Sequence, residues 1–201
     1  TGLHMNFAPV VDVNNNPNNP VINYRSFGED KEKVAEKGIA YMKGMQAQKI
    51  LTTAKHFPGH GDTDTDSHKA LPQINHPFTR LDSLEMYPFK KLIDAGIGGV
   101  MVAHLNIPAL DSSGVPSTLS KKIISGILKE KLGFKGLIVT DAMNMKGVTT
   151  GNEPGVVDKK AIIAGNDLLE FTEDVPKAIA EVRKAINQGV ISQAAIDEKC
   201  R

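Results

Sequence analysis

The sequence predicts an α/β fold, namely the C-terminal portion of a (β/α)8 TIM-type barrel with parallel strands, whose first strands are missing from this chain. Short apolar runs alternate with helical patterns along the 201 residues, and this alternation is typical of parallel βαβ units. Polar residues directly follow several of the apolar runs, as they do in barrels and in doubly wound sheets. No Gly-x-Gly-x-x-Gly follows a strand, which disfavours a dinucleotide-binding doubly wound sheet.

Five apolar runs are predicted to be strands, whereas a closed barrel has eight and typically ~250 residues. They cover residues 5–11, 51–55, 99–103, 137–140 and 167–171. Because five strands cannot close such a barrel, we expect roughly a hundred or more upstream residues of the same polypeptide to supply the missing strands. Residues 1–201 then form one partial barrel domain, with no second domain in this chain.

Helices are predicted between and after these strands. Asp30 can cap the first helix, which places Val34, Tyr41, Met42 and Met45 on one side. The remaining helices at the end of the chain are expected over residues 156–164, 176–187 and 193–200.

Two further helices lie between the second and fourth predicted strands. Asp82 and Glu85 resemble a capping box at the start of one helix, and Pro88 is expected to kink it. The other helix is predicted to begin at Ser120 and to end with Gly133 in the C′ position.

The composition is that of an ordinary soluble globular protein, with 40% hydrophobic and 23% charged residues and a net charge of +1. This charge gives no support for nucleic acid or an anionic membrane as a partner. The single cysteine, Cys200, provides neither a disulfide framework nor a thiolate metal site. No apolar stretch approaches the ~20 residues of a membrane helix, and the compartment, cytoplasmic or exported, stays open.

The most polar segment begins at the end of the second predicted strand and reads KHFPGHGDTDTDSH over residues 55–68. It combines histidines, aspartates and a lysine with Pro and Gly, whereas a solvated charge run would carry Lys and Glu. A buried strand that ends in a loop rich in titratable groups is typical of the catalytic face of a barrel enzyme.

Two aspartates are candidates for proton transfer or nucleophilic attack. Asp66 precedes His68 by two residues and can orient its imidazole for proton exchange near neutral pH, although an isolated Asp-x-His is more often a solvated pair. Asp141 lies at the tip of the strand predicted over 137–140, where capping of the next helix is an equally good interpretation.

Cationic residues at strand ends are candidates for substrate binding. Lys55 and His56 could instead form a buried salt bridge. Arg25 could hold the hydroxyls or carboxylate of a substrate, or pair with Asp30. The other polar residues after strands are expected to serve loop geometry by accepting backbone N–H groups, and they are Asp12, His104 and Asp167.

Metal binding needs a separate assessment. Residues 62–66 resemble the first half of a calcium loop, but Ser67 stands where Gly is required and Gln73 where Glu is required. His56, His60 and His68 could form a zinc site, although their spacing matches neither a His-x-x-x-His helix nor a zinc finger. A metal-dependent barrel hydrolase that uses these histidines therefore stays an alternative.

The string KHFPGHG, followed four residues later by DSH, resembles the signature of the β-N-acetylglucosaminidase branch of glycoside hydrolase family 3. The resemblance extends in order over almost the whole chain, through NFAPVVDV at 6–13, RSFG at 25–28, MVAH at 101–104, TDAM at 140–143 and AGND at 164–167. It implies a retaining β-N-acetylhexosaminidase that removes β-linked N-acetylglucosamine from non-reducing ends, on peptidoglycan fragments or chitooligosaccharides.

The same resemblance implies roles for individual residues. Asp141 would be the nucleophile, and His68, paired with Asp66, the general acid/base of a double displacement. Family 3 β-glucosidases take their acid/base from a carboxylate in a second domain, so the Asp-Ser-His sequence favours the glucosaminidase branch. No metal or organic cofactor is implied.

Binding of the sugar would fall to Arg25, Lys55 and His56. The Asp-x-Glu-Gly-Gly segment of the family, which also contacts the sugar, is absent upstream of Asn6. An inactive sugar-binding fragment is therefore the other alternative.

Overall fold

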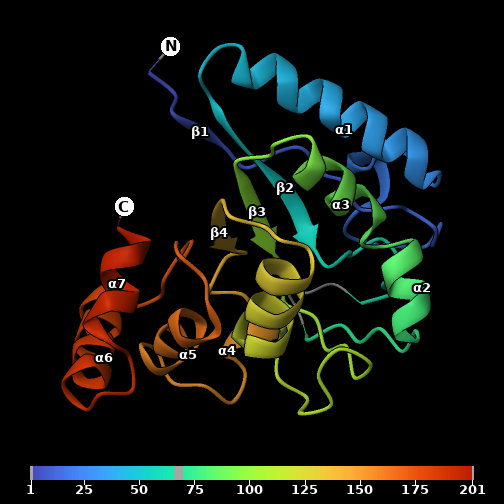
Figure 1. Cartoon of the computed structure of the whole chain (residues 1–201). Coiled ribbons are helices and arrows are strands. Elements are labelled where there is room, and N and C mark those ends of the chain that lie inside the picture. The colour runs from blue at the N-terminus through green and yellow to red at the C-terminus, as the bar shows by residue number, and fades with distance from the viewer. Residues whose placement is uncertain (1, 66–69, 201) are drawn as a thin grey trace.

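The computed structural model describes residues 2–65 and 70–200. Within these residues, its centre is a parallel sheet with the strand order β1–β2–β3–β4, shown in Figure 1. The strands are β1 (Met5–Asn6), β2 (Leu51–Phe57), β3 (Gly99–Val102) and β4 (Leu137–Thr140). Each strand lies beside the strand that precedes it in sequence, as in a (β/α) barrel, whereas a doubly wound sheet reverses its order. The predicted fold class is confirmed.

The segment predicted as the first strand, residues 5–11, runs along β2 but pairs with it irregularly. The carbonyl oxygens of Ala8 and Pro9 accept hydrogen bonds from β2, and Val10 forms an isolated parallel bridge with Lys55. Pro9 has no N–H to donate, which interrupts a regular ladder. The strand is therefore shorter than predicted, although its path is as expected.

The segment predicted as the last strand, residues 167–171, occupies the position of a fifth strand without forming a regular one. Leu168 makes an isolated parallel bridge to Val139 in β4. The Oδ2 atom of Asp167 accepts the N–H of Ile138 at 2.9 Å. A carboxylate thus replaces a backbone carbonyl at this point of the ladder, so the prediction of a regular strand is wrong in this detail.

The helix after the first strand is α1 (Lys31–Gln46), and it begins as predicted. The Oδ1 atom of Asp30 accepts two backbone N–H groups of the first turn, at 3.0 and 3.1 Å. Val34 and Met42 are fully buried. Tyr41 is 37% exposed, and its hydroxyl accepts a hydrogen bond from Asn6, so it does not share the buried side.

Two separate helices, α2 (Phe78–Ser83) and α3 (Tyr87–Asp94), replace the single helix predicted after Asp82. Asp82 lies inside α2, and its Oδ2 atom pairs with the Nζ atom of Lys90 at 2.7 Å. Pro88 lies in the first turn of α3, where a missing N–H costs no intrahelical hydrogen bond. The predicted capping box and the predicted kink are both wrong.

The helix predicted from Ser120 is a π-helix, η3 (Lys122–Lys131). The Oγ atom of Ser120 accepts the N–H of Ile123 at 3.2 Å, so this serine caps the helix from outside. Gly133 follows the C-terminal cap with a φ of +69°, as predicted for a C′ glycine.

The helices at the end of the chain follow the predicted ranges closely. They are α5 (Val156–Ala164), α6 (Val175–Asn187) and α7 (Gln193–Lys199). Three short elements complete the description, namely η1 (Asn23–Arg25), η2 (Ser117–Leu119) and α4 (Lys146–Thr149).

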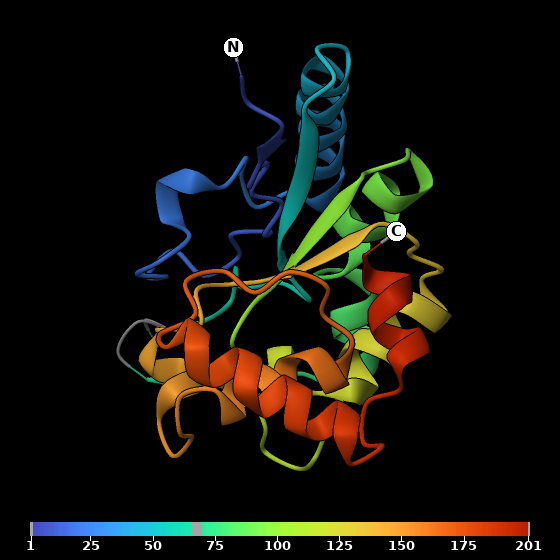
Figure 2. The same ribbon diagram turned by 90° about the vertical axis from the view of Figure 1, so that its left-hand side faces the viewer.

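The main hydrophobic core joins the strands to the helices that cover them. Helices α1 and α3 pack against each other and against β2, and the rings of Phe57 and Phe89 meet edge to face with centroids 5.3 Å apart. Helices α5 and α6 lie together at the opposite end of the molecule from α1 (Figures 1 and 2). None of the described helices is long and apolar enough to cross a membrane.

Candidate active site

A pocket of about 190 Å³ lies where β2 and β4 end. Parallel strands place their carboxyl ends along one edge, so the loops that follow different strands converge there. The pocket brings the predicted sugar-binding residues Arg25, Lys55 and His56 together with the predicted nucleophile Asp141. The predicted acid/base pair, Asp66 and His68, lies outside the described residues.

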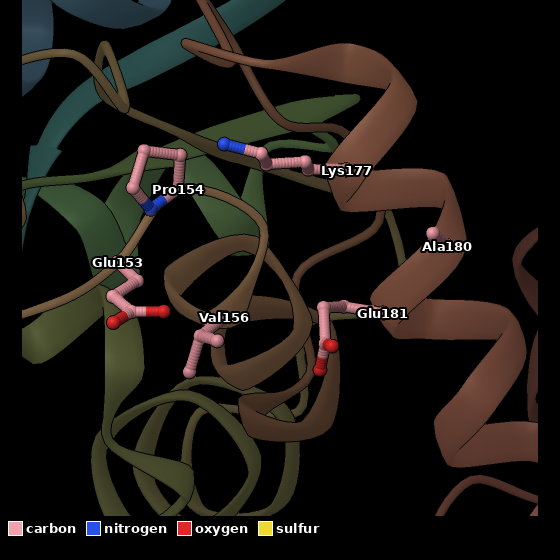
Figure 3. Close-up of a pocket in the computed structure, with 6 residues that line it drawn as sticks. All are labelled: Glu153, Pro154, Val156, Lys177, Ala180 and Glu181. Atoms are coloured by element: carbon pink, nitrogen blue, oxygen red, sulfur yellow. The ribbon is translucent and has the colours of Figure 1, made fainter.

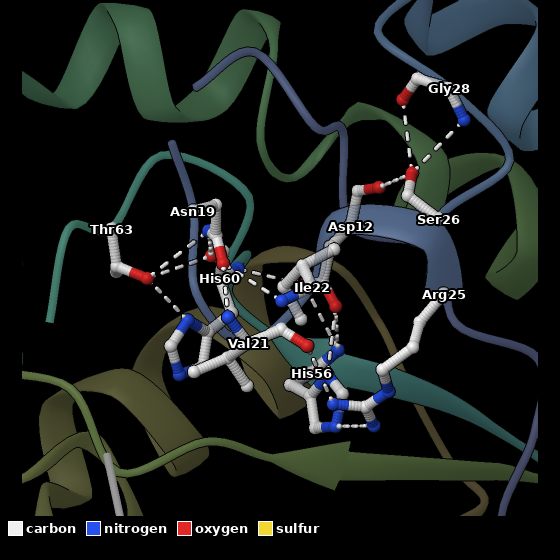
Figure 4. Close-up of polar contacts among 10 residues, drawn as sticks. All are labelled: Asp12, Asn19, Val21, Ile22, Arg25, Ser26, Gly28, His56, His60 and Thr63. Carbon is white, nitrogen blue, oxygen red and sulfur yellow. Dashed lines mark hydrogen bonds and ion pairs between the residues drawn. The ribbon is translucent and has the colours of Figure 1, made fainter. Parts of the chain in front are cut away.

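Asp12, which follows the first strand segment, anchors the far end of β2 (Figure 4). Its Oδ1 atom accepts the backbone N–H groups of His60 at 2.7 Å and His56 at 3.1 Å, and its Oδ2 atom lies 2.7 Å from Nδ1 of His56. Burial raises the pKa of the Asp12 carboxyl, but the His56 ring and the hydrogen bonds from His56 and His60 outweigh it and lower that pKa below 3.8. The predicted role in loop geometry is confirmed.

The imidazole of His56 lies between the carboxylate of Asp12 and the guanidinium of Arg25. Its Nδ1 atom faces Asp12, and its Nε2 atom lies 3.3 Å from a guanidinium nitrogen of Arg25. A guanidinium only donates hydrogen bonds, so Nε2 is the acceptor and Nδ1–H donates to the carboxylate. Both ring nitrogens are therefore engaged, which disfavours His56 as a zinc ligand.

Arg25 extends from the loop after β1 into the pocket (Figure 4). A second guanidinium nitrogen donates to the carbonyl oxygen of Val21 at 3.2 Å. Asp30, the alternative partner considered for Arg25, instead caps α1. The guanidinium is thus positioned by His56 and by its own loop, and it faces the space in which Asp141 lies.

Lys55 lies on β2 and lines the same pocket. Burial and the neighbouring Arg25 lower the pKa of the Lys55 amine, and the carboxylates of Asp141 and Glu170 oppose this shift. An amine flanked by two carboxylates in a small pocket can donate hydrogen bonds to a polar ligand and neutralise part of their charge.

Asp141 follows β4 directly. Its backbone N–H donates to the carbonyl oxygen of Val102 at the end of β3, and its Oδ1 atom accepts the N–H of Ala142 at 2.9 Å. Burial raises the pKa of the Asp141 carboxyl, but His56, His104, the Ala142 N–H and Lys55 together lower it below its ordinary value. The side chain is therefore an anion over the whole neutral range.

Glu170 also lines the pocket, and it is not among the residues that the sequence predicts to be functional. Burial and the nearby charge of Asp141 raise the pKa of the Glu170 carboxyl. The one signal in the sequence was its position, since Glu170 is the polar residue that ends the apolar run after Asp167.

His60 and His104 support the walls of the site. The Nδ1 atom of His60 lies 2.7 Å from the hydroxyl of Thr63, and that of His104 lies 2.7 Å from the hydroxyl of Thr118. His104 also contacts the carbonyl oxygen of Ala142, at 3.0 Å from Nε2, so it fixes the loop that begins at Asp141. The expected structural role of His104 is confirmed.

The loop between β2 and α2 is closed by a polar cluster. The Oδ2 atom of Asp62 lies 2.5 Å from Nε2 of His76, and the guanidinium of Arg80 lies 3.5 Å from the same oxygen. Arg80 also pairs with the buried Glu85 at 3.1 Å. This cluster joins the two ends of the segment that carries Asp66 and His68 in the sequence.

Within the described residues, the same cluster holds the group of side chains that could bind a metal ion. Ligand atoms of Asp62, His76 and Glu85 lie within 4.8 Å of one another. However, the Arg80 cation already pairs with both carboxylates, so the cluster is an ion-pair network rather than an open metal site.

A larger cavity, of about 430 Å³, lies between the start of α5 and the face of α6. Lys177 and Glu181 extend from α6 towards it, opposite Glu153 and Pro154 (Figure 3). The predicted site residues that the structure describes, namely Arg25, Lys55, His56 and Asp141, do not line this cavity. The smaller pocket beside Asp141 is therefore the candidate active site.

Known proteins resemble this chain in sequence and in structure. Beta-hexosaminidase A of Pseudoalteromonas piscicida is 42% identical over 178 residues, which are 83% of this chain and 30% of that protein. The beta-N-acetylglucosaminidase/beta-glucosidase of Cellulomonas fimi is 32% identical over 206 residues, covering 98% of this chain and 36% of that protein. The chain thus spans about a third of the length of these two relatives.

A solved structure shows the same fold. The glycoside hydrolase family 3 beta-N-acetylglucosaminidase from Paenibacillus sp. str. FPU-7 superposes with a TM-score of 0.96 at 42% identity, covering 99% of this chain and 38% of that one. The family described as "Glycosyl hydrolase family 3 N terminal domain" matches residues 1–201. The chain therefore belongs to glycosyl hydrolase family 3, as part of its N-terminal domain.

Proposed function

We propose that the complete polypeptide is a retaining β-N-acetylglucosaminidase that releases terminal β-linked N-acetylglucosamine. The observation that supports this most strongly is Asp141, an anionic carboxylate in a pocket with Arg25, Lys55 and His56. Retaining glycosidases need a carboxylate of this kind to form the glycosyl–enzyme bond. The names of the relatives support the sugar, because each of the three compared proteins is named a hexosaminidase or an N-acetylglucosaminidase, although that of Cellulomonas fimi is also named a beta-glucosidase.

In the first half of the reaction, an oxygen of Asp141 bonds to the anomeric carbon while the bond from that carbon to the leaving oxygen breaks. His68, paired with Asp66, gives its proton to the leaving oxygen. A histidine can replace the usual carboxylic acid, because its unperturbed pKa of about 6.5 lies near the working pH.

In the second half, His68 takes a proton from water, and the water oxygen bonds to the anomeric carbon as the bond to Asp141 breaks. Two displacements at one carbon retain the β configuration. The nucleophile returns as a carboxylate, and the imidazole is protonated again. These two steps need neither a metal nor an organic cofactor.

Sugar binding is assigned to Arg25, Lys55 and His56. A volume of about 190 Å³ is below the roughly 300 Å³ at which sites for drug-sized ligands begin, so the pocket suits a single sugar ring. This supports action at chain ends, and the substrates we propose are peptidoglycan fragments or chitooligosaccharides.

Proton NMR of the first-formed sugar tests the reaction. The full-length protein should release N-acetylglucosamine from an aryl β-glycoside initially as the β-anomer, and the initial α-anomer would contradict the proposal. A metal-dependent hydrolase using His56, His60 and His68 would lose activity to a chelator, whereas we expect no loss. A silent sugar-binding protein would bind N-acetylglucosamine and release no aryl alcohol.

A further inference from the structure

Glu170 is fixed at the candidate active site by its backbone. Its N–H donates to the hydroxyl of Thr140 at 3.1 Å, and its carbonyl oxygen accepts the N–H of Met143 at 2.8 Å. These two partners stand on either side of Asp141 in the sequence. The position of Glu170 is therefore tied to that of Asp141 by two hydrogen bonds of its backbone, one to the Thr140 side chain and one to the Met143 backbone.

The Glu170 side chain lines the same pocket as Asp141 and Lys55. The Glu170 carboxylate opposes the fall in the pKa of the Lys55 amine, and burial, together with the charge of Asp141, raises the pKa of the Glu170 carboxyl. A second carboxylate beside an anionic Asp141 is electrostatically unfavourable unless a hydrogen-bond donor or a cation compensates its charge.

We propose that Glu170 is a specificity-determining residue that accepts a hydrogen bond from a hydroxyl group of the sugar bound beside Asp141. This inference rests on the proposed function and deepens it, because it assigns a contact that the sequence resemblance did not imply.

The chemistry of the pocket explains the need for such an acceptor. Arg25 and Lys55 are donors only, so they can bind the oxygens of a sugar but cannot accept its hydroxyl protons. A carboxylate is an acceptor with two oxygens, and hydrogen bonds to charged groups are about twice as strong as neutral ones. Asp141 must keep its oxygens for the anomeric carbon, which leaves Glu170 as the carboxylate acceptor for the rest of the ring among the described residues that line the pocket.

The experiment compares Glu170→Ala and Glu170→Gln with the wild-type full-length protein. Substrates are an aryl β-N-acetylglucosaminide and its 3-deoxy, 4-deoxy and 6-deoxy analogues. Glu173, an exposed glutamate three residues further on, provides the matched control Glu173→Ala. Melting curves by circular dichroism show whether each variant folds. If Glu170→Ala does not fold, Glu170→Gln, which keeps the side-chain volume, takes its place in the comparison.

We expect Glu170→Ala to lower kcat/KM for the parent glycoside by about 10- to 100-fold, as for loss of a hydrogen bond to a charged group. For the one deoxy analogue that lacks the partner hydroxyl, the same substitution should cost less than about threefold. Glu170→Gln should lie between the two, and Glu173→Ala should match the wild type on every substrate.

Equal losses on all four substrates would overturn the proposal. A loss that instead grows as the leaving group becomes more basic would identify Glu170 as a proton donor, and it would also overturn the proposal.

Binding of N-acetylglucosamine itself, measured by calorimetry with the same deoxy series, separates this inference from the proposed reaction. If the protein bound the sugar without hydrolysing it, the proposed function would fail. Glu170 would then still be supported if Glu170→Ala weakened binding of the parent sugar and not of one deoxy sugar, and it would be refuted if all affinities fell alike.

Discussion

The Nδ1 atom of His56 lies 2.7 Å from the Oδ2 atom of Asp12, and both side chains are buried. The same carboxylate also accepts the backbone N–H of His56, inside β2, and that of His60, in the loop after β2. The ring that faces the pocket and the chain that carries it are thus fixed by one anion. Asp12 lies 44 residues before His56 in the sequence, so this anchor joins separate parts of the chain.

Replacement of this anchor should destabilise the fold. In Asp12→Asn an amide nitrogen replaces one carboxylate oxygen and faces an N–H donor that this oxygen had bound, and each buried donor left unsatisfied costs about 1–3 kcal/mol. We expect the free energy of unfolding at pH 7 to fall by about 3 kcal/mol, measured by urea titration.

The pH dependence gives a second test. The pKa of Asp12 lies below 3.8 in the folded state, so its contribution is complete above 3.8 and is lost as the pH falls through the lower folded value. The difference between wild type and Asp12→Asn should therefore shrink only below about pH 4. A constant difference down to pH 2 would contradict this account.

Asp141→Ala should abolish turnover and leave folding intact. The Asp141 carboxylate accepts one local N–H and packs little, whereas a double displacement without its nucleophile loses on the order of 4 kcal/mol or more, about 10³-fold in rate. Turnover of an aryl glycoside and the melting temperature are the measurements. A variant within tenfold of the parent would mean that another group is the nucleophile.

His68→Ala should show a loss that depends on the leaving group. A good aryloxide leaves without protonation, so the first step should change little for an activated substrate. A sugar alkoxide needs the proton, so chitobiose should be hydrolysed far more slowly. Asp66→Ala should act in the same direction more weakly, and equal losses on both substrates would point to a structural role for His68.

The acidic limb of activity should belong to Glu170 rather than to Asp141. The pKa of the Glu170 carboxyl is raised above 4.5, and that of Asp141 is lowered below 3.8. As the pH falls, Glu170 is therefore protonated first and loses its charge, while the nucleophile stays ionised. We expect kcat/KM to fall through a pKa above 4.5 in the wild type, and Glu170→Gln to be lower at neutral pH but flat in that range. An unchanged limb in the variant would assign it to another group.

Asp111 offers a stability test outside the pocket. Burial raises the pKa of its carboxyl, but hydrogen bonds from Ser120, Ser113 and Lys122 lower it to about 2. The shift from 3.8 corresponds to about 2 kcal/mol of stability that is present above pH 4 and lost as the pH falls towards 2. Asp111→Asn should remove this pH-dependent contribution to the free energy of unfolding, measured by urea titration near pH 4 and near pH 2. The same pH dependence in the wild type and the variant would refute this expectation.

The sequence was sufficient for the parts that depend on local patterns. Apolar runs located the strands, and the position of Asp141 and Lys55 at strand ends predicted a shared edge, because parallel strands end on the same side. Asp30 and Gly133 marked helix ends through chemistry that acts within a few residues.

What the sequence could not provide was pairing between distant segments. The acceptor role of Asp12 was predictable, but its partners His56 and His60 were not, because no local rule links Asp12 to β2 and the loop after it. Glu170 was missed for a similar reason, since its neighbours along the chain are apolar and Asp141 becomes its neighbour only in the fold. Asp82 was misread because its partner Lys90 belongs to a second helix.

The bond between Asp62 and His76 also bears on how such a domain changes over evolution. It joins two residues 14 positions apart, so the chain between them begins and ends at nearly the same place in space. Loops with their ends held together tolerate changes of length at small entropic cost. Under the proposed mechanism, changes of length in this segment that keep Asp66, His68 and the buried Ile74 are therefore a route to new leaving-group preferences that leaves the barrel strands unaltered.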